Sequence, residues 1–295
     1  MIKISVPGTS ANLGPGFDCL GIALNLYNSF YVEEIQQGFV LENCDDEYNN
    51  EDNLVYSTAM NVLNRYNKKI KGLKIKFCCD IPTSRGLGSS ASCIVAGVYI
   101  ANELGNLNLC QDEIFNISSK IEGHPDNVAP AIYGGMTASL IENDKVYTQN
   151  INIKDGLKFL AIIPNYQLST KKSREVLPEK IDYKDGVYNI GRVSYLISCL
   201  INGDFEKIRL GLQDKLHEPY RGKLIRNFND IRNKALNLDA YGVYLSGAGP
   251  TMMAIVDNSD DKFENNIVSY LKTFDVDYDV LELSIDKNGV IVENI

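Results

Sequence analysis

The segment IPTSRGLGSSAS, residues 81–92, has the composition of a loop that binds an anion. Gly86 and Gly88 permit backbone conformations that are closed to other residues, so successive N–H groups can converge on one ligand. The helical pattern that begins near Ser89 would point its unpaired N–H groups and its positive dipole end at the same ligand. The segment therefore predicts phosphate binding, although a purely structural turn between a strand and a helix has the same composition.

The loop matches neither of the two common nucleotide-binding patterns. A Walker A loop has a lysine and then a serine or threonine directly after its second glycine, whereas Ser89 and Ser90 follow Gly88 here. The loop is not a G-x-G-x-x-G segment either. Because backbone N–H groups can supply the donors, a lysine is not obligatory, and one of the serine hydroxyls could face a metal ion.

Two further glycine-rich segments point to the same ligand. They are VPGTSANLGPGFDCLGIAL at residues 6–24 and LSGAGPTMMAIV at residues 245–256. One such segment is a weak signal, because tight structural turns also need glycine. Three of them, each beside a predicted strand, indicate three backbone segments that close on one ligand.

Composition excludes several classes of protein. The chain has 295 residues with a formal net charge of −9, whereas a nucleic-acid-binding protein would present a basic face. No signal peptide and no apolar run long enough to span a bilayer is present, so we expect neither a membrane nor a nucleic-acid partner. The seven cysteines form no C-x-x-C pair. We therefore expect small buried residues in a cytoplasmic protein and no zinc site.

Hydrophobic periodicity predicts mixed helices and strands in two halves. Strands are expected at 2–6, near 20–26 and 29–35, within 72–81 and at 136–141, and helices at 53–66 behind an Asp52 cap, from 89 to about 105, and at 111–121. The residue pattern changes near residue 155, and the segment KFLAIIPNY that follows predicts a new buried strand. Helical patterns around 186–202, 204–212 and 223–237 and a last helix–strand unit near 260–284 complete the second half.

The three glycine-rich segments together resemble the motifs of the GHMP kinases, the family of galacto-, homoserine, mevalonate and phosphomevalonate kinases. Residues 81–92 resemble the ATP-phosphate loop of that family. Residues 6–18 and 245–251 resemble its first and third motifs, in the right order and spacing. The resemblance covers essentially the whole chain.

The resemblance implies an α+β fold of two domains. Residues 1–155 are expected to form the N-terminal ATP-binding domain, which is similar to a ribosomal-protein domain with a left-handed β-α-β crossover. Residues 156–295 are expected to form a ferredoxin-like α+β domain. ATP would lie in a cleft between the two domains.

Within the family, three segments are most similar to homoserine kinases: PGTSANLGPGFDCLG, EGHPDNVAPAIYGG and HEPYR. The resemblance implies ATP-dependent phosphorylation of the side-chain hydroxyl of L-homoserine, with Mg²⁺, in threonine biosynthesis. Homodimers also occur in this family, so a homodimer is one implied assembly. Two alternatives stay open: a GHMP kinase for another small alcohol, and a relative that binds ATP or a ligand without turnover.

The resemblance also assigns binding residues. The ATP-binding loop would comprise Pro82, Thr83, Ser84, Arg85, Gly86, Leu87, Gly88, Ser89, Ser90, Ala91 and Ser92. The substrate would be held by Asn12, Asp18, His124, Thr170, Arg174 and Arg221. Arginine suits the substrate carboxylate because its planar fork can donate two hydrogen bonds to it. From the residues alone, Asn12 and Asp18 could equally be turn residues, and the two arginines could be ordinary surface residues.

Catalysis and metal binding are assigned in the same way. Asn127 and Asp18 would position the hydroxyl without a general base, since a loose phosphoryl-transfer transition state leaves a base little to do. Asp126 is an alternative base, although it could simply cap the next helix. Ser90 and Glu122 are the candidate Mg²⁺ ligands. At the longer spacing seen in some relatives this chain has Asn116, which is a poor ligand for Mg²⁺.

Overall fold

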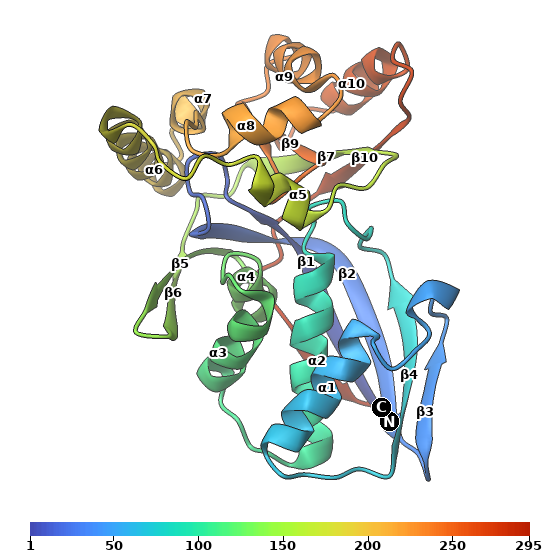
Figure 1. The fold of residues 1–295 in the computed structure, drawn as a ribbon. Coiled ribbons are helices and arrows are strands. Elements are labelled where there is room, and N and C mark those ends of the chain that lie inside the picture. Colours follow the sequence, from blue (N-terminus) through green and yellow to red (C-terminus); the bar gives the residue numbers. More distant parts are fainter.

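The computed structural model describes residues 1–295 and contains two β-sheets, each packed against helices (Figure 1). The first sheet has seven strands, which are β1 (Ile2–Ala11), β2 (Leu20–Glu34), β3 (Gly38–Glu42), β4 (Gly72–Cys79), β5 (Met136–Glu142), β6 (Lys145–Ile151) and β11 (Ile291–Asn294). Its helices are α1 (Leu54–Arg65), α2 (Ser89–Gly105), α3 (Gln111–Glu122) and α4 (Val128–Tyr133). A 3-10 turn at Asp46–Tyr48 precedes α1.

The first sheet runs in the order β11-β1-β2-β4-β3, with β5 paired to β2 and β6 to β5. Only β3 and β4 pair in parallel, and α1 connects them. This is the β-α-β unit of the domain, and its handedness stays a prediction. The register of β1 on β2 shifts between Pro7 and Gly8, at the start of the first glycine-rich segment.

The second sheet is antiparallel and has the order β10-β7-β9-β8. Its strands are β7 (Leu157–Pro164), β8 (Gly242–Leu245), β9 (Met252–Asp257) and β10 (Tyr278–Leu283). Its helices are α5 (Thr170–Glu175), α6 (Tyr183–Asn202), α7 (Ile208–Gly211), α8 (Glu218–Arg221), α9 (Phe228–Asn237) and α10 (Phe263–Leu271), with 3-10 turns at Phe205–Lys207 and Gly222–Leu224. This strand order confirms the predicted ferredoxin-like arrangement.

Helix α2 is the central helix of the first domain, and most of its residues are buried. It packs closely on α1 because Gly97 leaves room there: a Cβ on Gly97 would come within 2.6 Å of Cβ of Thr58. The same glycine and its apolar neighbours place the first turn of α2 at the top of the domain, facing α5 (Figure 1). The packing therefore directs the N-terminus of α2 toward the second domain.

The structure corrects several local predictions. Residues 20–34 form one continuous strand instead of two. The cap of α1 is Asn53, whose side chain accepts hydrogen bonds from the N–H groups of Val55 and Tyr56, and not Asp52. The last strand, β11, was not predicted and pairs with β1, so the range 156–295 includes one strand of the first sheet.

The expectation of buried cysteines is also mostly wrong. Only Cys199 is buried, whereas Cys78, Cys79 and Cys110 are exposed and the others are half-buried. Cys78 and Cys79 are the last two residues of β4, and both of these consecutive side chains are exposed. None of the helices combines the length and the apolar composition that crossing a bilayer requires.

Candidate active site

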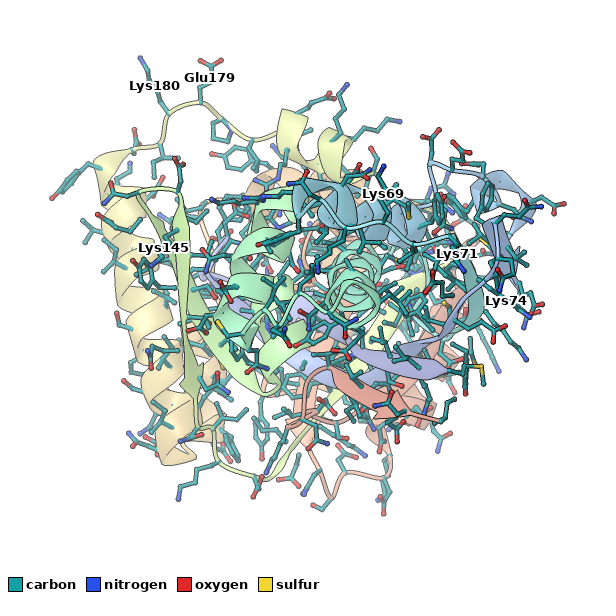
Figure 2. The ribbon with its side chains drawn as sticks, turned by 90° about the horizontal axis from the view of Figure 1, so that it is seen from below. Lys69, Lys71, Lys74, Lys145, Glu179 and Lys180 are labelled. Carbon is teal, nitrogen blue, oxygen red and sulfur yellow. The ribbon has the colours of Figure 1, made fainter.

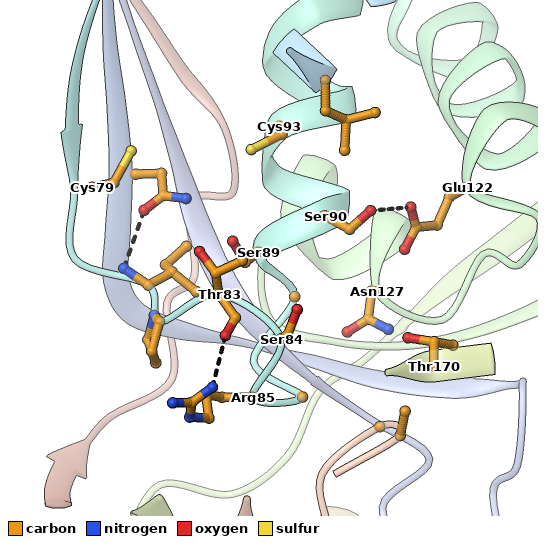
Figure 3. A pocket seen from close by; sticks show the side chains of 18 of the residues that line it. Cys79, Thr83, Ser84, Arg85, Ser89, Ser90, Cys93, Glu122, Asn127 and Thr170 are labelled. Atoms are coloured by element: carbon orange, nitrogen blue, oxygen red, sulfur yellow. Dashed lines mark hydrogen bonds between the residues drawn. The ribbon is translucent and has the colours of Figure 1, made fainter. Parts of the chain in front are cut away.

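The three glycine-rich segments meet at one cleft of about 660 Å³ between the two domains. Its lining includes every polar residue predicted to contact substrate or metal: Asn12, Asp18, Ser90, Glu122, His124, Asn127, Thr170, Arg174 and Arg221. Figure 3 shows the side chains of Ser84, Ser89, Ser90 and Asn127 around the same space. A cleft of this size is typical of a small-molecule site.

The anion-binding geometry of the loop depends on its two glycines. Gly88 takes a left-handed conformation (φ 75°) directly before α2 and leaves the helix without a side-chain cap. A Cβ on Gly86 would come within 2.4 Å of the carbonyl oxygen of Ser246, and Ser246 Oγ donates to the carbonyl of Gly86 at 2.6 Å. The first-turn N–H groups of α2 therefore stay free for a ligand, on a loop that is fastened to the third motif.

Not all of the predicted loop faces the cleft. Eight of its residues line it: Pro82, Thr83, Ser84, Arg85, Gly86, Gly88, Ser89 and Ser90. Leu87 and Ala91 are buried in the hydrophobic cores, and Ser92 is buried with its hydroxyl donating to the carbonyl of Ser89. Leu87 precedes α2, whereas Ala91 and Ser92 lie in its first turn on the side of the helix that faces the core. The side chains of these three residues therefore cannot contact ATP.

Ser90 and Glu122 lie together although 32 positions separate them, and Ser90 Oγ donates to Glu122 Oε2 at 2.8 Å (Figure 3). Asn116 is engaged elsewhere, because its Oδ1 accepts from the N–H of Val146. Burial raises the pKa of Glu122 above its ordinary value. The pair offers hard oxygen atoms at the edge of the phosphate loop, a donor set that fits Mg²⁺.

Asn127 is held by a buried hydrogen bond from the first motif, since Thr9 Oγ1 donates to Asn127 Oδ1 at 2.8 Å. A Cβ on Gly88 would come within 2.0 Å of Thr9 Oγ1, so Thr9 packs directly against the phosphate loop. This contact links the loop to Asn127, which lines the cleft and whose Nδ2 donates to Asp126 Oδ1 at 3.4 Å. Sequence reasoning missed Thr9, which has no signal beyond its place in the first motif.

Asp126 is buried and serves two neighbours. Its Oδ1 lies 2.9 Å from His124 Nδ1 and accepts the backbone N–H of Asn127, also at 2.9 Å. Burial lowers the pKa of His124, but the hydrogen bond and the charge of Asp126 outweigh it, so the pKa lies above its ordinary value of 6.5. Asp126 therefore positions His124 and Asn127 through its contacts.

Asp18 and Arg174 form a two-bond ion pair at the mouth of the cleft. Arg174 Nη1 and Nη2 donate to the two carboxylate oxygens of Asp18 at 3.0 and 2.9 Å. Both side chains are between a third and two fifths exposed, so solvent and ligands can reach the pair. Asp18 has positive φ (54°), a conformation that aspartate adopts more readily than most residues other than glycine.

Arg221 is a buried cation without a carboxylate partner. It is 2% exposed, and its Nε and Nη1 donate to the carbonyls of Ser173 and Gly247 at 3.1 Å each. Burial lowers its pKa to about 10, so it stays charged near neutral pH. Nη2 has no protein acceptor, and the residue lines the cleft. A buried guanidinium of this kind indicates a site for an anion.

The ring of Phe17 lies beside both arginines, with its centroid 4.9 Å from Cζ of Arg221 and 5.8 Å from Cζ of Arg174. His217 stacks against the same ring, with centroids 5.1 Å apart, and its Nε2 lies 2.8 Å from the carbonyl of Gly14. Sequence reasoning missed Phe17. The sequence offered one signal, an aromatic residue directly before Asp18 in the first motif.

Both polar side-chain atoms of Asn12 form hydrogen bonds within the protein. Its Nδ2 donates to the carbonyl of Gly247 at 2.9 Å, and its Oδ1 accepts the N–H of Asp18 at 3.0 Å. The carbonyl of Gly247 thus receives donors from both Asn12 and Arg221. Asn12 fixes the conformation around Asp18, and its direct contact with substrate stays a prediction.

The other end of the cleft is lined by Asn53, which was predicted to lie near the adenine, and by residues without a predicted role, including Asn43, Cys44, Phe77, Cys79 and Cys93. Cys79 and Cys93 face this end in Figure 3. Burial raises the pKa of the half-buried Cys93 thiol to about 12, so it stays neutral. Asp45 and Asp80, which follow Cys44 and Cys79 in the chain, also line the cleft, so this end combines neutral side chains with two carboxylates.

Comparisons with known proteins agree with this geometry. The model of the GHMP kinases N terminal domain matches residues 53–135, and the model of the GHMP kinases C terminal region matches residues 196–272. A homoserine kinase of Clostridium botulinum (strain ATCC 19397 / Type A) is 49% identical over 294 residues, which is 100% of this chain and 99% of that protein.

Solved structures extend the comparison to the fold. The crystal structure of homoserine kinase from Cytophaga hutchinsonii has a TM-score of 0.88 at 27% identity and covers 99% of this chain and 97% of that chain. The mevalonate kinase of L. major, solved with R-mevalonate, shares the fold with a TM-score of 0.73 at 18% identity, over 97% and 96% of the two chains. From its motifs, its fold and its full-length relatives, the chain belongs to the GHMP kinase family.

Proposed function

We propose that this chain transfers the γ-phosphoryl group of ATP to the side-chain hydroxyl of L-homoserine, giving O-phospho-L-homoserine. The full-length identity of 49% to a homoserine kinase supports this substrate. The step belongs to threonine biosynthesis, where the hydroxyl must be converted into a better leaving group. In the transfer, the substrate oxygen forms a bond to the γ-phosphorus, the bond to the bridging oxygen of ADP breaks, and the hydroxyl proton passes to the phosphoryl oxygens.

The observation that carries the proposal is the buried Arg221 beside the Asp18–Arg174 ion pair. Arg221 has a free Nη2 and no acidic partner, so it would bind the substrate carboxylate. Asp18 can accept the ammonium group in exchange for Arg174, which would then turn to the carboxylate as well. A zwitterionic amino acid satisfies all three charges, whereas a neutral sugar satisfies none of them.

The phosphate loop and the Ser90–Glu122 pair form the nucleotide side of the site. The free N–H groups at the start of α2 suit the phosphates of ATP. Ser90 and Glu122 would hold Mg²⁺, and no cluster of three or more acidic or histidine side chains competes for the ion. Mg²⁺ bound there would neutralise charge on the phosphates.

Catalysis by positioning fits the residues around the acceptor hydroxyl. Asn127 cannot take up a proton, and its amide is fixed by Thr9. Asp126 is turned to His124 and to the backbone of Asn127, so it orients them. Orientation and charge neutralisation supply most of the rate of a loose phosphoryl transfer, which leaves no need for a strong base.

Three further assignments, which concern domains, location and assembly, stay predictions. They are the division into domains at residue 155, a cytoplasmic location and assembly as a homodimer. The first can be checked by expressing residues 1–155 and 156–295 separately and recording whether either part folds. The second can be checked by fractionation of cells.

The test of function is ADP release by the purified chain with Mg-ATP and one alcohol at a time: L-homoserine, L-serine, L-threonine, mevalonate or galactose. We expect turnover with homoserine far above the rest. Turnover with mevalonate or galactose instead would show that the substrate is another alcohol and not homoserine. ATP binding without turnover on any of them would indicate a binding protein and overturn the proposal.

A further inference from the structure

Glu218 is a buried carboxylate that has no role in the transfer as described so far. It is the first residue of α8, lies three positions before Arg221 and is 3% exposed. It does not line the cleft, and it faces a second cavity of about 280 Å³ between α8 and α9. Glutamate is almost never buried to this extent without partners that replace its lost hydration. The partners of Glu218 therefore show what this side chain holds in place.

Glu218 attaches α8 to the third glycine-rich segment. Its Oε1 accepts the backbone N–H of Leu245, the last residue of β8, at 2.7 Å. At the other end of α8, Arg221 Nη1 donates to the carbonyl of Gly247 at 3.1 Å. One helical turn therefore holds residues 245–247 by an acceptor at one end and by a donor at the other.

The position of α8 depends on its contacts with other elements. A helix of one turn is not stable by itself, because starting a helix fixes several residues for one hydrogen bond. Here Asp214 Oδ2 accepts the backbone N–H groups of His217 and Glu218 at 2.8 and 2.7 Å. Asn189 of α6 in turn donates to Asp214 Oδ1 at 2.7 Å. The start of α8 is thus anchored, and the bond from Leu245 to Glu218 joins the third segment to this anchored turn.

The direction of the Arg221 side chain depends on the carbonyl of Gly247. That carbonyl and the carbonyl of Ser173 are the two acceptors to which the guanidinium donates within the chain. We propose that Glu218 is a positioning residue for substrate binding. Through Leu245 it keeps the carbonyl of Gly247 in the place that directs Arg221 into the cleft. The inference rests on the proposed function, in which Arg221 binds the substrate carboxylate, and extends it to a residue outside the cleft.

The charge of Glu218 lowers the stability of the fold. Four other titratable groups surround it: Arg232 of α9, Asp214 before α8, Tyr244 of β8 and Lys223 at the cavity. Arg232 Nη1 lies 3.3 Å from Glu218 Oε2 and favours the carboxylate, but burial outweighs it and raises the pKa of Glu218 to about 7. Because this pKa lies above the ordinary value of 4.5, the ionised side chain disfavours the folded state as the pH rises through this range. Stability alone would favour a neutral residue here, which supports a role of Glu218 in function.

The first test compares Glu218→Gln with Glu218→Ala. Glutamine keeps an oxygen that can accept the N–H of Leu245, whereas alanine has none. We expect Glu218→Ala to raise KM for homoserine about tenfold, and Glu218→Gln to raise it by less than about threefold. Affinity for ATP, measured by calorimetry, should stay within about twofold of the wild type in both variants, which also shows that they are folded. Glu179→Ala is the matched control, because Figure 2 shows this exposed side chain pointing away from the molecule between α5 and α6.

An unchanged KM for homoserine in Glu218→Ala would overturn the proposal, and so would an increase in Glu218→Gln as large as that in Glu218→Ala. Equal losses of homoserine and ATP affinity together with a lower Tm would indicate a role in stability alone and would also overturn it. Since Glu218 acts through Arg221, Glu218→Ala should add little to the KM increase caused by Arg221→Ala. An additive increase would show that the two residues act independently, against the proposal.

Amide hydrogen exchange tests the same contact without turnover. The peptide that covers residues 242–251 should exchange faster in Glu218→Ala than in the wild type, because the N–H of Leu245 loses its acceptor. Glu218→Gln should exchange at nearly the wild-type rate. Unchanged exchange in Glu218→Ala would overturn the proposal. A wild type that does not turn over homoserine would contradict the proposed function instead, and exchange would then decide whether Glu218 holds the third segment.

Discussion

The carboxylate of Asp18 and the guanidinium of Arg174 lie 156 positions apart in the chain and form two hydrogen bonds of 3.0 and 2.9 Å across the domain cleft. The pair lies at the proposed substrate end of the cleft. The ammonium and carboxylate groups of a zwitterion could replace each member as the ion-pair partner of the other. The pair therefore connects the fold, which brings the segment between β1 and β2 beside α5, to the choice of substrate.

This ion pair predicts strong coupling between its two members. Asp18→Asn should reduce kcat/KM for homoserine at least tenfold, since the ammonium loses its acceptor and Arg174 loses its partner. Arg174→Gln should reduce it similarly, and the double variant should cost much less than the sum, because removing one charge already leaves the other unpaired. Additive losses in this double-mutant cycle would show that the two side chains act separately.

Arg221 should affect homoserine and leave ATP nearly unchanged. Arg221→Ala removes a charge-assisted contact to the carboxylate and should cost roughly 2–4 kcal/mol in kcat/KM for homoserine. Arg221→Lys should recover only part of this, because a lysine cannot reproduce the planar fork. The exposed Arg226→Ala is the control. An equal loss of ATP affinity, measured by calorimetry, would contradict the assignment of Arg221 to the substrate side.

Phe17 should matter through its ring face. Phe17→Leu keeps an apolar side chain but removes the π-face beside Arg174 and Arg221, which should weaken homoserine binding by about 0.5–2 kcal/mol. Phe17→Tyr should retain near-normal KM. The measurement is KM for homoserine at saturating ATP, and equal losses in both variants would indicate a steric role only.

Glu122 should set the Mg²⁺ requirement. Glu122→Gln keeps the hydrogen bond acceptor for Ser90 but removes the charge, so half-maximal activity should need about tenfold more Mg²⁺. Asn116→Ala is the contrasting variant. It removes the bond to the N–H of Val146 and should lower the free energy of unfolding by about 1 kcal/mol, with no change in Mg²⁺ dependence. A changed Mg²⁺ dependence in Asn116→Ala would indicate that Asn116, and not Glu122, contributes to the Mg²⁺ site.

The pH profile of kcat/KM for homoserine should have two assignable limbs. Burial raises the pKa of Glu122 above 4.5, so activity should fall on the acid side as this carboxyl is protonated. Asp126 raises the pKa of His124 above 6.5, so a role of the imidazolium near the substrate should be lost as the pH rises through that higher value. Asp126→Asn should lower the pKa of His124 and move the alkaline limb to lower pH. A limb that does not move would exclude His124 as its origin.

The sequence alone determined those features that depend on local chemistry. Glycines at 86 and 88 predict a loop that only they can form, and the structure gives both positive φ. The three motifs also predicted the family, the two-domain α+β fold and a common cleft. These predictions succeeded because backbone freedom and helix ends are properties of a few consecutive residues.

Only the tertiary structure decided which partner each side chain meets. Ser90 is hydrogen-bonded to Glu122, and Asn116 does not take part in this contact. Thr9 donates a hydrogen bond to Asn127, which lies 118 positions later in the chain. Asn12 donates its side-chain N–H to the carbonyl of Gly247. The side chains of Leu87, Ala91 and Ser92 are buried in the interior. The burial of Arg221, the ring of Phe17 beside it and the return of β11 to β1 likewise follow from how the two sheets assemble. Such contacts join residues that are distant in the chain, so their geometry depends on packing and not on local pattern.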